Sequence, residues 1–277
     1  MLISNFKVSF NLPFSKKKIS LREISNFYYL DLLKYLENNN SYDIEYYFNF
    51  LISELTNTDI SELSNIDKFY ILLELRALSL GSNIDLVQDN TNFKINIDNI
   101  LKKLTDLNLT TKHFRASDIE YELSIPKNLY FDENIDIYHA TISKIDEFNM
   151  SSIHDIDLAS MLPANIFTYI KNYVTDTKKL LDNYSILDKK THSKIEEWPL
   201  NVYNNSLFDF LKLIYHDNLM NFYEMQFNLL TKMHISYDHF MSMTFNESKL
   251  FINLQNKEIK KQEEAEKKKN SGHPLPL

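Results

Sequence analysis

The spacing of apolar residues predicts helices in the first part of the chain. Apolar side chains recur every three or four positions over residues 21–36, 44–55 and 66–80, as on one face of an α-helix. The first segment starts with Ser20-Leu21-Arg22-Glu23, which has the spacing of a capping box. The third is followed by Gly81, a residue type that commonly ends helices in the left-handed conformation. We therefore expect successive helices in this part of the chain.

Alternating apolar and polar residues predict strands in two regions. Residues 2–14 alternate and indicate an opening strand. Residues 84–97 indicate two short strands joined by a turn over residues 89–92, and residues 119–125 and 135–138 are further extended candidates. We expect the later segments to form a small, mainly antiparallel β region.

Helical spacing returns after residue 155. The pattern predicts helices over residues 166–181 and 205–234, and from Asn246 to Ile259. The middle segment is apolar on so many sides that we expect it to be central in a C-terminal bundle. The charged run over residues 260–269 has no apolar stripe, so we expect a solvated helix end or a tether.

These patterns predict an α+β protein that is predominantly helical. Its expected parts are an N-terminal strand and helical part, a small antiparallel β region, a C-terminal helical bundle, and a charged tail with a proline-rich end. The expected boundaries of these parts are residues 1–81, 82–150, 151–259 and 260–277.

Glycine and cysteine counts exclude several kinds of site. The chain has two glycines, Gly81 and Gly272, whereas phosphate-binding loops need several glycines where the backbone meets the ligand. A Walker loop, a Rossmann fingerprint, a kinase loop and a nucleophile elbow are therefore excluded. The absence of cysteine excludes disulfide scaffolds, thiol nucleophiles and cysteine-ligated zinc or iron–sulfur sites. We expect no cofactor.

Charge and hydropathy bear on partners and location. The formal charge of −8 and the wide sequence separation of Arg22, Arg76 and Arg115 argue against a nucleic-acid partner. No apolar window approaches the ~18 residues of a membrane span, and the first residues lack the features of a signal peptide. We expect a protein without a membrane span in a reducing cytosol.

Histidine and acidic residues suggest one enzymatic alternative. His154-Asp155 and His216-Asp217 are doublets like those of helical metal-dependent phosphohydrolases, and His139 and Asp238 are candidate partners for them. An HD-type metal-dependent phosphohydrolase therefore stays open as the main alternative function, and a general cytoplasmic chaperone or adaptor stays open as a second.

Other candidate metal ligands do not form a recognisable site. His234 and His239 would diverge by about 140° on a continuous helix. The acidic pairs Asp132-Glu133 and Asp155-Asp157 lack the turn-forming glycine of a calcium loop. We expect these acids to be solvated at the surface, and no metal site is predicted.

Aromatic clusters at Phe27-Tyr28-Tyr29 and Tyr46-Tyr47-Phe48 lie among acidic residues. Base-stacking platforms work beside a cationic groove, so packing in a core or an interface is the better interpretation. The surplus of tyrosine and phenylalanine suits a protein that buries large surfaces against partners.

The last residues of the sequence are a candidate partner-binding segment. After the charged run, the short break around Gly272 leads into an apolar stretch in which proline restricts the backbone to extended conformations. Such a segment loses little entropy on entering a groove, although a disordered tail has the same composition. The candidate partner-binding residues are His273, Pro274, Leu275, Pro276 and Leu277.

Two stretches carry a resemblance to a known family. Residues 65–81 read NIDKFYILLELRALSLG and pass directly into predicted strands. Residues 235–247 read ISYDHFMSMTFNE and lead into a charged helix. The first resembles the N-terminal helix motif of the baseplate hub proteins of T-even-like contractile-tailed bacteriophages, and the second is similar to the ending of these proteins.

The resemblance implies a non-enzymatic structural or assembly component, with a chaperone-like role, of a phage tail baseplate hub. It implies binding to other phage tail or hub proteins, in the host cytoplasm during assembly, with retention in the virion tail baseplate and oligomerisation left open. In the first motif, Asp67, Lys68, Glu74 and Arg76 are either partner contacts or exposed charges of an ordinary amphipathic helix.

Overall fold

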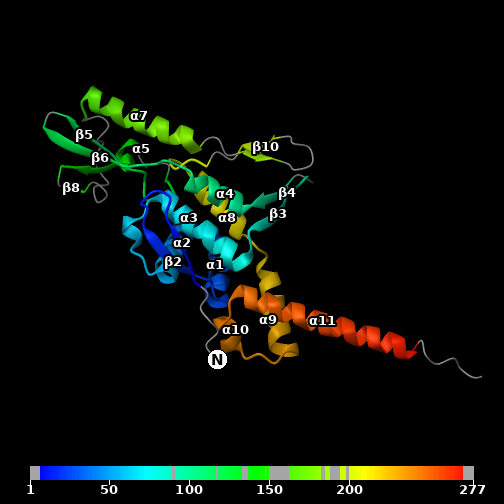
Figure 1. Cartoon of the computed structure of the whole chain (residues 1–277). Helices are drawn as coiled ribbons and strands as arrows, with labels where there is room; N and C mark the ends of the chain where they lie inside the picture. Colours follow the sequence, from blue (N-terminus) through cyan, green and yellow to red (C-terminus); the bar gives the residue numbers. More distant parts are fainter. Residues whose placement is uncertain are drawn as a thin grey trace, which may run out of the picture. The chain divides into compact units, whose positions relative to one another are not determined.

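The computed structural model consists of two compact units (Figure 1). Unit 1 comprises Met1–Glu23 and Asn38–His216, and unit 2 comprises Ile24–Glu37 and Asp217–Leu277. The structure describes residues 7–88, 91–116, 118–132, 137–146, 148–149, 162–181, 185–187, 194–197 and 200–270. These residues confirm the predicted fold class, an α+β protein that is mostly helical with small antiparallel sheets. The four-part division predicted from the sequence stays a prediction.

Unit 1 begins with an antiparallel hairpin. Strand β1 (Lys7–Asn11) pairs with β2 (Lys18–Arg22). The predicted opening strand is confirmed at residues 7–11, and its residues 2–6 lie outside the described residues. The capping box predicted at residues 20–23 is wrong, because most of it belongs to β2. Ile19 and Leu21 alternate into the core along this strand, and this period-two burial outweighs the local capping pattern.

Two capped helices follow in unit 1. Helix α2 (Ser41–Thr56) starts at Asn40, whose side chain accepts hydrogen bonds from the first-turn amides. After the short 3₁₀ helix η1 (Ile60–Glu62), helix α3 (Asn65–Leu80) ends at Gly81, which adopts φ 94°. A non-glycine residue would be strained there. Because most of α3 is buried, it is the central helix of unit 1.

The β region contains a hairpin and a separate sheet. Its elements are β3 (Asn83–Gln88), β4 (Thr91–Asn96), α4 (Ile97–Thr105), β5 (Lys112–Ala116), β6 (Ile119–Leu123), α5 (Ile137–Thr141), β7 (Ile142–Ile145) and β8 (Phe148–Asn149). Strands β3 and β4 pair with each other, and the sheet has the antiparallel order β5-β6-β7-β8. The prediction of an extended segment over residues 135–138 is wrong at residues 137 and 138, where α5 begins.

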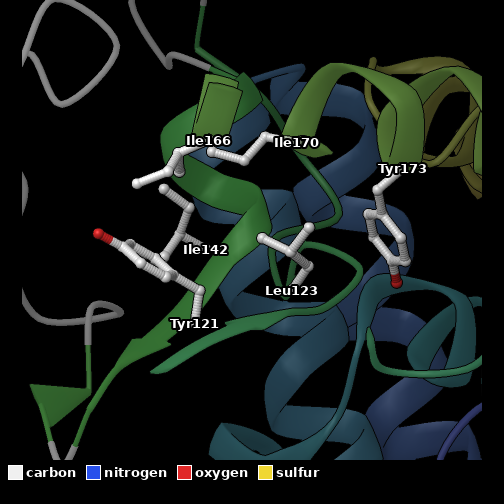
Figure 2. Packing of buried hydrophobic residues seen from close by; sticks show 6 residues of the cluster. All are labelled: Tyr121, Leu123, Ile142, Ile166, Ile170 and Tyr173. Atoms are coloured by element: carbon white, nitrogen blue, oxygen red, sulfur yellow. The ribbon is translucent and has the colours of Figure 1, made fainter. Parts of the chain in front are cut away.

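Helix α7 (Ala164–Leu181) packs on this sheet through one hydrophobic cluster (Figure 2). The sheet side contributes Tyr121, Leu123 and Ile142, and α7 contributes side chains one turn apart that face them. The helical residues of this cluster are Ile166, Ile170 and Tyr173. Their burial attaches α7 to the sheet.

Unit 1 ends with a hairpin and a helix. Strands β9 (Ser185–Leu187) and β10 (Lys194–Glu197) pair within the segment predicted as a helical bundle. Helix α8 (Ser206–Tyr215) packs on α3, and the Tyr215 hydroxyl donates to the Leu72 carbonyl at 2.7 Å.

Unit 2 is helical and is built from two separate chain segments. Its helices are α1 (Asn26–Asn38), α9 (Leu219–Lys232), α10 (Tyr237–Ser242) and α11 (Phe245–Asn270). The predicted helix over residues 205–234 is wrong as one element, because α8 ends at Tyr215 and α9 starts after its own cap, Asn218. The last helix starts at Phe245, where Thr244 and Glu247 form a reciprocal capping box.

A buried asparagine joins the two segments of unit 2. The Asn26 side-chain amide donates to the Phe240 carbonyl at 2.8 Å and to the Ser248 hydroxyl at 2.6 Å. We expect Asn26→Ala to lower the free energy of unfolding by about 1.5 kcal/mol, because both acceptors lose a buried partner. Chemical denaturation of the full chain measures this loss. An exposed control, Asn256→Ala, should leave stability unchanged, and an equal loss in both variants would contradict the role of Asn26.

Candidate protein-binding surface

The polar residues of the 65–81 motif make internal contacts. Asp67 is fully buried, and its carboxylate accepts backbone hydrogen bonds from Phe14 at 2.9 Å and Ser15 at 3.1 Å. Burial raises the pKa of Asp67, and these hydrogen bonds oppose the rise. The expectation that Asp67 is a partner contact or an exposed charge is wrong, because this residue fixes the turn after β1.

Lys68 is also buried, so the same expectation is wrong for it. Burial lowers the pKa of Lys68 to about 8, and the negative charge of Glu45 partly opposes this effect. The Glu45 carboxylate accepts a hydrogen bond from the Leu129 amide at 2.7 Å, and burial raises the pKa of Glu45. Lys68 and Glu45 are therefore oppositely charged groups inside unit 1.

Two further motif residues bind distant backbone within unit 1. The Asn65 side-chain amide donates to the Val202 carbonyl at 2.6 Å. Arg76 donates to the Ile214 carbonyl at 2.8 Å and to the Gly81 carbonyl at 2.7 Å. These side chains of the motif helix are thus engaged within unit 1.

The candidate metal ligands do not come together in the described part of the chain. His216 and Asp217 are exposed, and the Asp217 carboxylate accepts the neighbouring Asn218 amide. Asp238 lies exposed in α10, whereas His154 and Asp155 lie outside the described residues. Among the described residues, no group of three or more histidines or acids is arranged to hold a metal.

The remaining sequence candidates are separated in the structure. His234 has a left-handed backbone between α9 and α10, while His239 lies within α10, so they do not share one helix. Asp132 accepts a hydrogen bond from the Tyr42 hydroxyl and is not simply solvated as predicted. Its neighbour Glu133 and the candidate partner-binding residues 273–277 lie outside the described residues.

Helix α9 carries an exposed apolar face. Met220, Tyr223 and Phe227 are 60%, 41% and 63% exposed, and they follow each other at helical spacing. Together with Glu224 and Asn228 they line a shallow, open depression, which we call the α9 groove. Exposed apolar side chains gathered on one helix face are typical of a protein-binding surface.

The opposite face of α9 is packed inside unit 2. Phe222, Met225 and Leu229 are buried, and the Phe222 ring lies 5.6 Å from the Phe240 ring. The sequence pattern of α9, apolar on many sides, led to the prediction that this segment is central. That prediction is wrong for the exposed face of α9. The residues on this face, Met220, Tyr223 and Phe227, could not be told from core residues by the sequence pattern.

Helix α2 carries a second exposed aromatic face, in unit 1. Tyr42, Tyr46 and Phe50 recur every four residues and are exposed. The hydrogen bond that Tyr42 donates to Asp132 raises the pKa of Tyr42 to about 12. The aromatic cluster at residues 46–48 is split between the core and the surface. Tyr47 and Phe48 are buried, whereas Tyr46 is exposed.

The end of α11 is a solvated helix, one of the two forms expected for the charged run. Every residue from Asn256 to Lys267 is exposed, and Lys261 pairs with Glu258 one turn away.

No helix in the described part of the chain is both long and apolar enough to cross a membrane.

The described residues thus combine an internally bonded scaffold with exposed apolar helix faces. The family model for the T4 bacteriophage base plate protein matches residues 3–201 of the chain. The chain therefore belongs to this family of phage baseplate proteins. No curated protein and no solved structure matches it.

Proposed function

We propose that this chain is a structural or assembly component of the phage baseplate hub. The observation that carries the proposal is the family match over residues 3–201, and the exposed apolar faces of α2 and α9 support it. The proposed mechanism is stoichiometric and non-enzymatic: apolar side chains exposed in the isolated chain become covered by other hub proteins. Binding starts in the host cytoplasm during assembly.

The proposal includes a docking role for residues 273–277. Helix α11 acts as a charged spacer that carries this segment away from the packed part of unit 2. Pro274 and Pro276 restrict the backbone before binding, so less conformational entropy is lost when a partner groove takes up the segment.

Affinity purification of the tagged chain from phage-infected cells tests the hub assignment. We expect other tail or hub proteins to co-purify in near-stoichiometric amounts. Purification with no tail protein would contradict the assignment. A transition metal retained at about one ion per chain would contradict the non-enzymatic mechanism.

Deletion of residues 271–277 tests the docking role. We expect the amount of co-purified hub protein to fall roughly tenfold, because the apolar anchors are lost. A matched control replaces residues 274–277 by Gly-Ser-Gly-Ser, which keeps the length but removes the prolines and leucines, and it should lose as much. Unchanged co-purification in both variants would exclude docking through this segment.

A further inference from the structure

The α9 groove is an open, mostly apolar depression on one face of a helix. Met220 and Phe227 lie seven residues apart, which places them about 10 Å apart along the helix axis. Tyr223 lies between them with its ring partly exposed. The opposite side of α9 is packed, and a helix that is apolar on two sides is normally covered on both.

We propose that the α9 groove of one copy binds residues 274–277 of another copy of this chain. Proline-rich extended segments bind aromatic-lined grooves because their backbone is already ordered. A polyproline II helix has three residues per turn and rises 3.1 Å per residue, so Pro274 and Leu277 share one side about 9 Å apart. This spacing is close to the separation of Met220 and Phe227. The inference rests on the proposed docking role of residues 273–277.

Polar groups of the groove complement the segment. A polyproline II backbone has no internal hydrogen bonds, so its carbonyls can accept from the Tyr223 hydroxyl. Glu224 lines the groove, and three lysines, Lys267, Lys268 and Lys269, precede the segment in the sequence. Their attraction to Glu224 predicts that binding weakens as salt is raised.

The reach of the chain favours binding between copies. Helix α11 contacts α9 but is fully exposed from Asn256 to Lys267, and Figure 1 shows it continuing far beyond α9. The stretch from Asn256 to Asn270 is about 21 Å long. Pro274 lies four residues past Asn270 and reaches at most about 14 Å back. This reach is shorter than the exposed stretch of α11, which favours binding to the α9 groove of another copy.

The groove and the segment are different surfaces of the same chain. Their pairing is head-to-tail, so each bound copy presents a vacant groove or segment to the next. Depending on the rotation between copies, such contacts close into a ring or continue as a chain. This contact between the α9 groove and residues 274–277 is the one through which copies of the protein self-associate within the hub.

A labelled synthetic peptide of residues 267–277 tests the contact. Its binding to the chain with residues 271–277 deleted is measured by fluorescence anisotropy, because the deletion removes the competing segment. We expect saturable binding, weakened roughly fivefold or more by Phe227→Ala and by the Leu277→Ala peptide. The exposed aromatic Tyr46 on α2 provides the matched control, since Tyr46→Ala should leave the affinity unchanged.

The outcomes separate this inference from the proposed function. Absence of saturable binding, or equal affinity for the Phe227→Ala and unsubstituted chains, would overturn the α9 contact. If the deletion still lowers co-purification of hub proteins in that case, the docking role stands with a different receptor. Light scattering gives an independent measure: the full chain should self-associate with increasing concentration, and the Phe227→Ala chain should stay monomeric over the same range.

Discussion

Asp67→Ala is expected to lower the free energy of unfolding of unit 1 by about 3 kcal/mol. The substitution removes a buried carboxylate that accepts hydrogen bonds from the part-buried Phe14 and Ser15 amides, and a donor left without an acceptor away from water costs about 1–3 kcal/mol. Asp67→Asn keeps one acceptor oxygen and should lose less. The exposed acid Asp43 in α2 is the control, since Asp43→Ala should lose at most about 0.5 kcal/mol.

Amide hydrogen exchange locates the effect of this substitution. Protection of Phe14 and Ser15 should fall in Asp67→Ala before protection of the α3 core is lost, because the carboxylate fixes that turn directly. Unchanged protection at these two amides would show that Asp67 does not hold the turn. Far-ultraviolet circular dichroism provides the check that the variant is folded.

The stability of the chain is expected to rise by about 2 kcal/mol between pH 7.5 and 9.5 through Lys68. Its pKa is about 8 in the folded protein and about 10.4 in an unfolded chain. Between these values the unfolded state binds more protons than the folded state, so stability increases with pH. Below about pH 7 both states are protonated and the contribution is flat.

Urea denaturation at several pH values in this window measures the Lys68 effect. Lys68→Met should remove the rise, and Lys171→Met, a change at an exposed lysine of α7, should retain it. The ordinary pKa of a tyrosine in an unfolded chain is about 10, so the series stops at pH 9.5 to keep tyrosine ionisation out of the measurement. A rise that persists in Lys68→Met would assign the pH dependence to another group.

Much of the helical architecture could be predicted because it depends on local periodicity. The spacing of apolar residues located α2, α3 and α7, and the position of Gly81 indicated the end of α3. Ser20–Glu23 shows the limit of local patterns. Its capping spacing is real, but pairing with residues 7–11 forms a strand there instead.

The roles of the motif residues could not be predicted from spacing alone. On a helix, Asp67 and Lys68 look like solvent-exposed charges, but their environment is set by residues far away in sequence. The turn held by Asp67 lies about 50 residues earlier, and the carbonyl bound by Asn65 lies 137 residues later. Contacts at such separations follow from the tertiary fold, which periodicity does not specify.

The α9 groove was missed for a related reason. An all-round apolar helix predicts burial on every side, and the sequence cannot distinguish burial within one chain from burial by a partner. Phe222 is covered within unit 2, whereas Phe227 on the other side of the helix is exposed. The same pattern thus contained both a core face and a surface face.

The discontinuity of unit 2 affects how the protein matures on the ribosome. Helix α1 buries Tyr29 against Phe222 and Phe245, yet unit 2 resumes only at Asp217, about 180 residues after Glu37. At translation rates of about 5–20 residues per second, α1 waits roughly 10–40 s for these partners. During that interval its buried leucines lack the packing partners that the second segment of unit 2 supplies. Unit 2 is thus completed only after all of unit 1 has been synthesised.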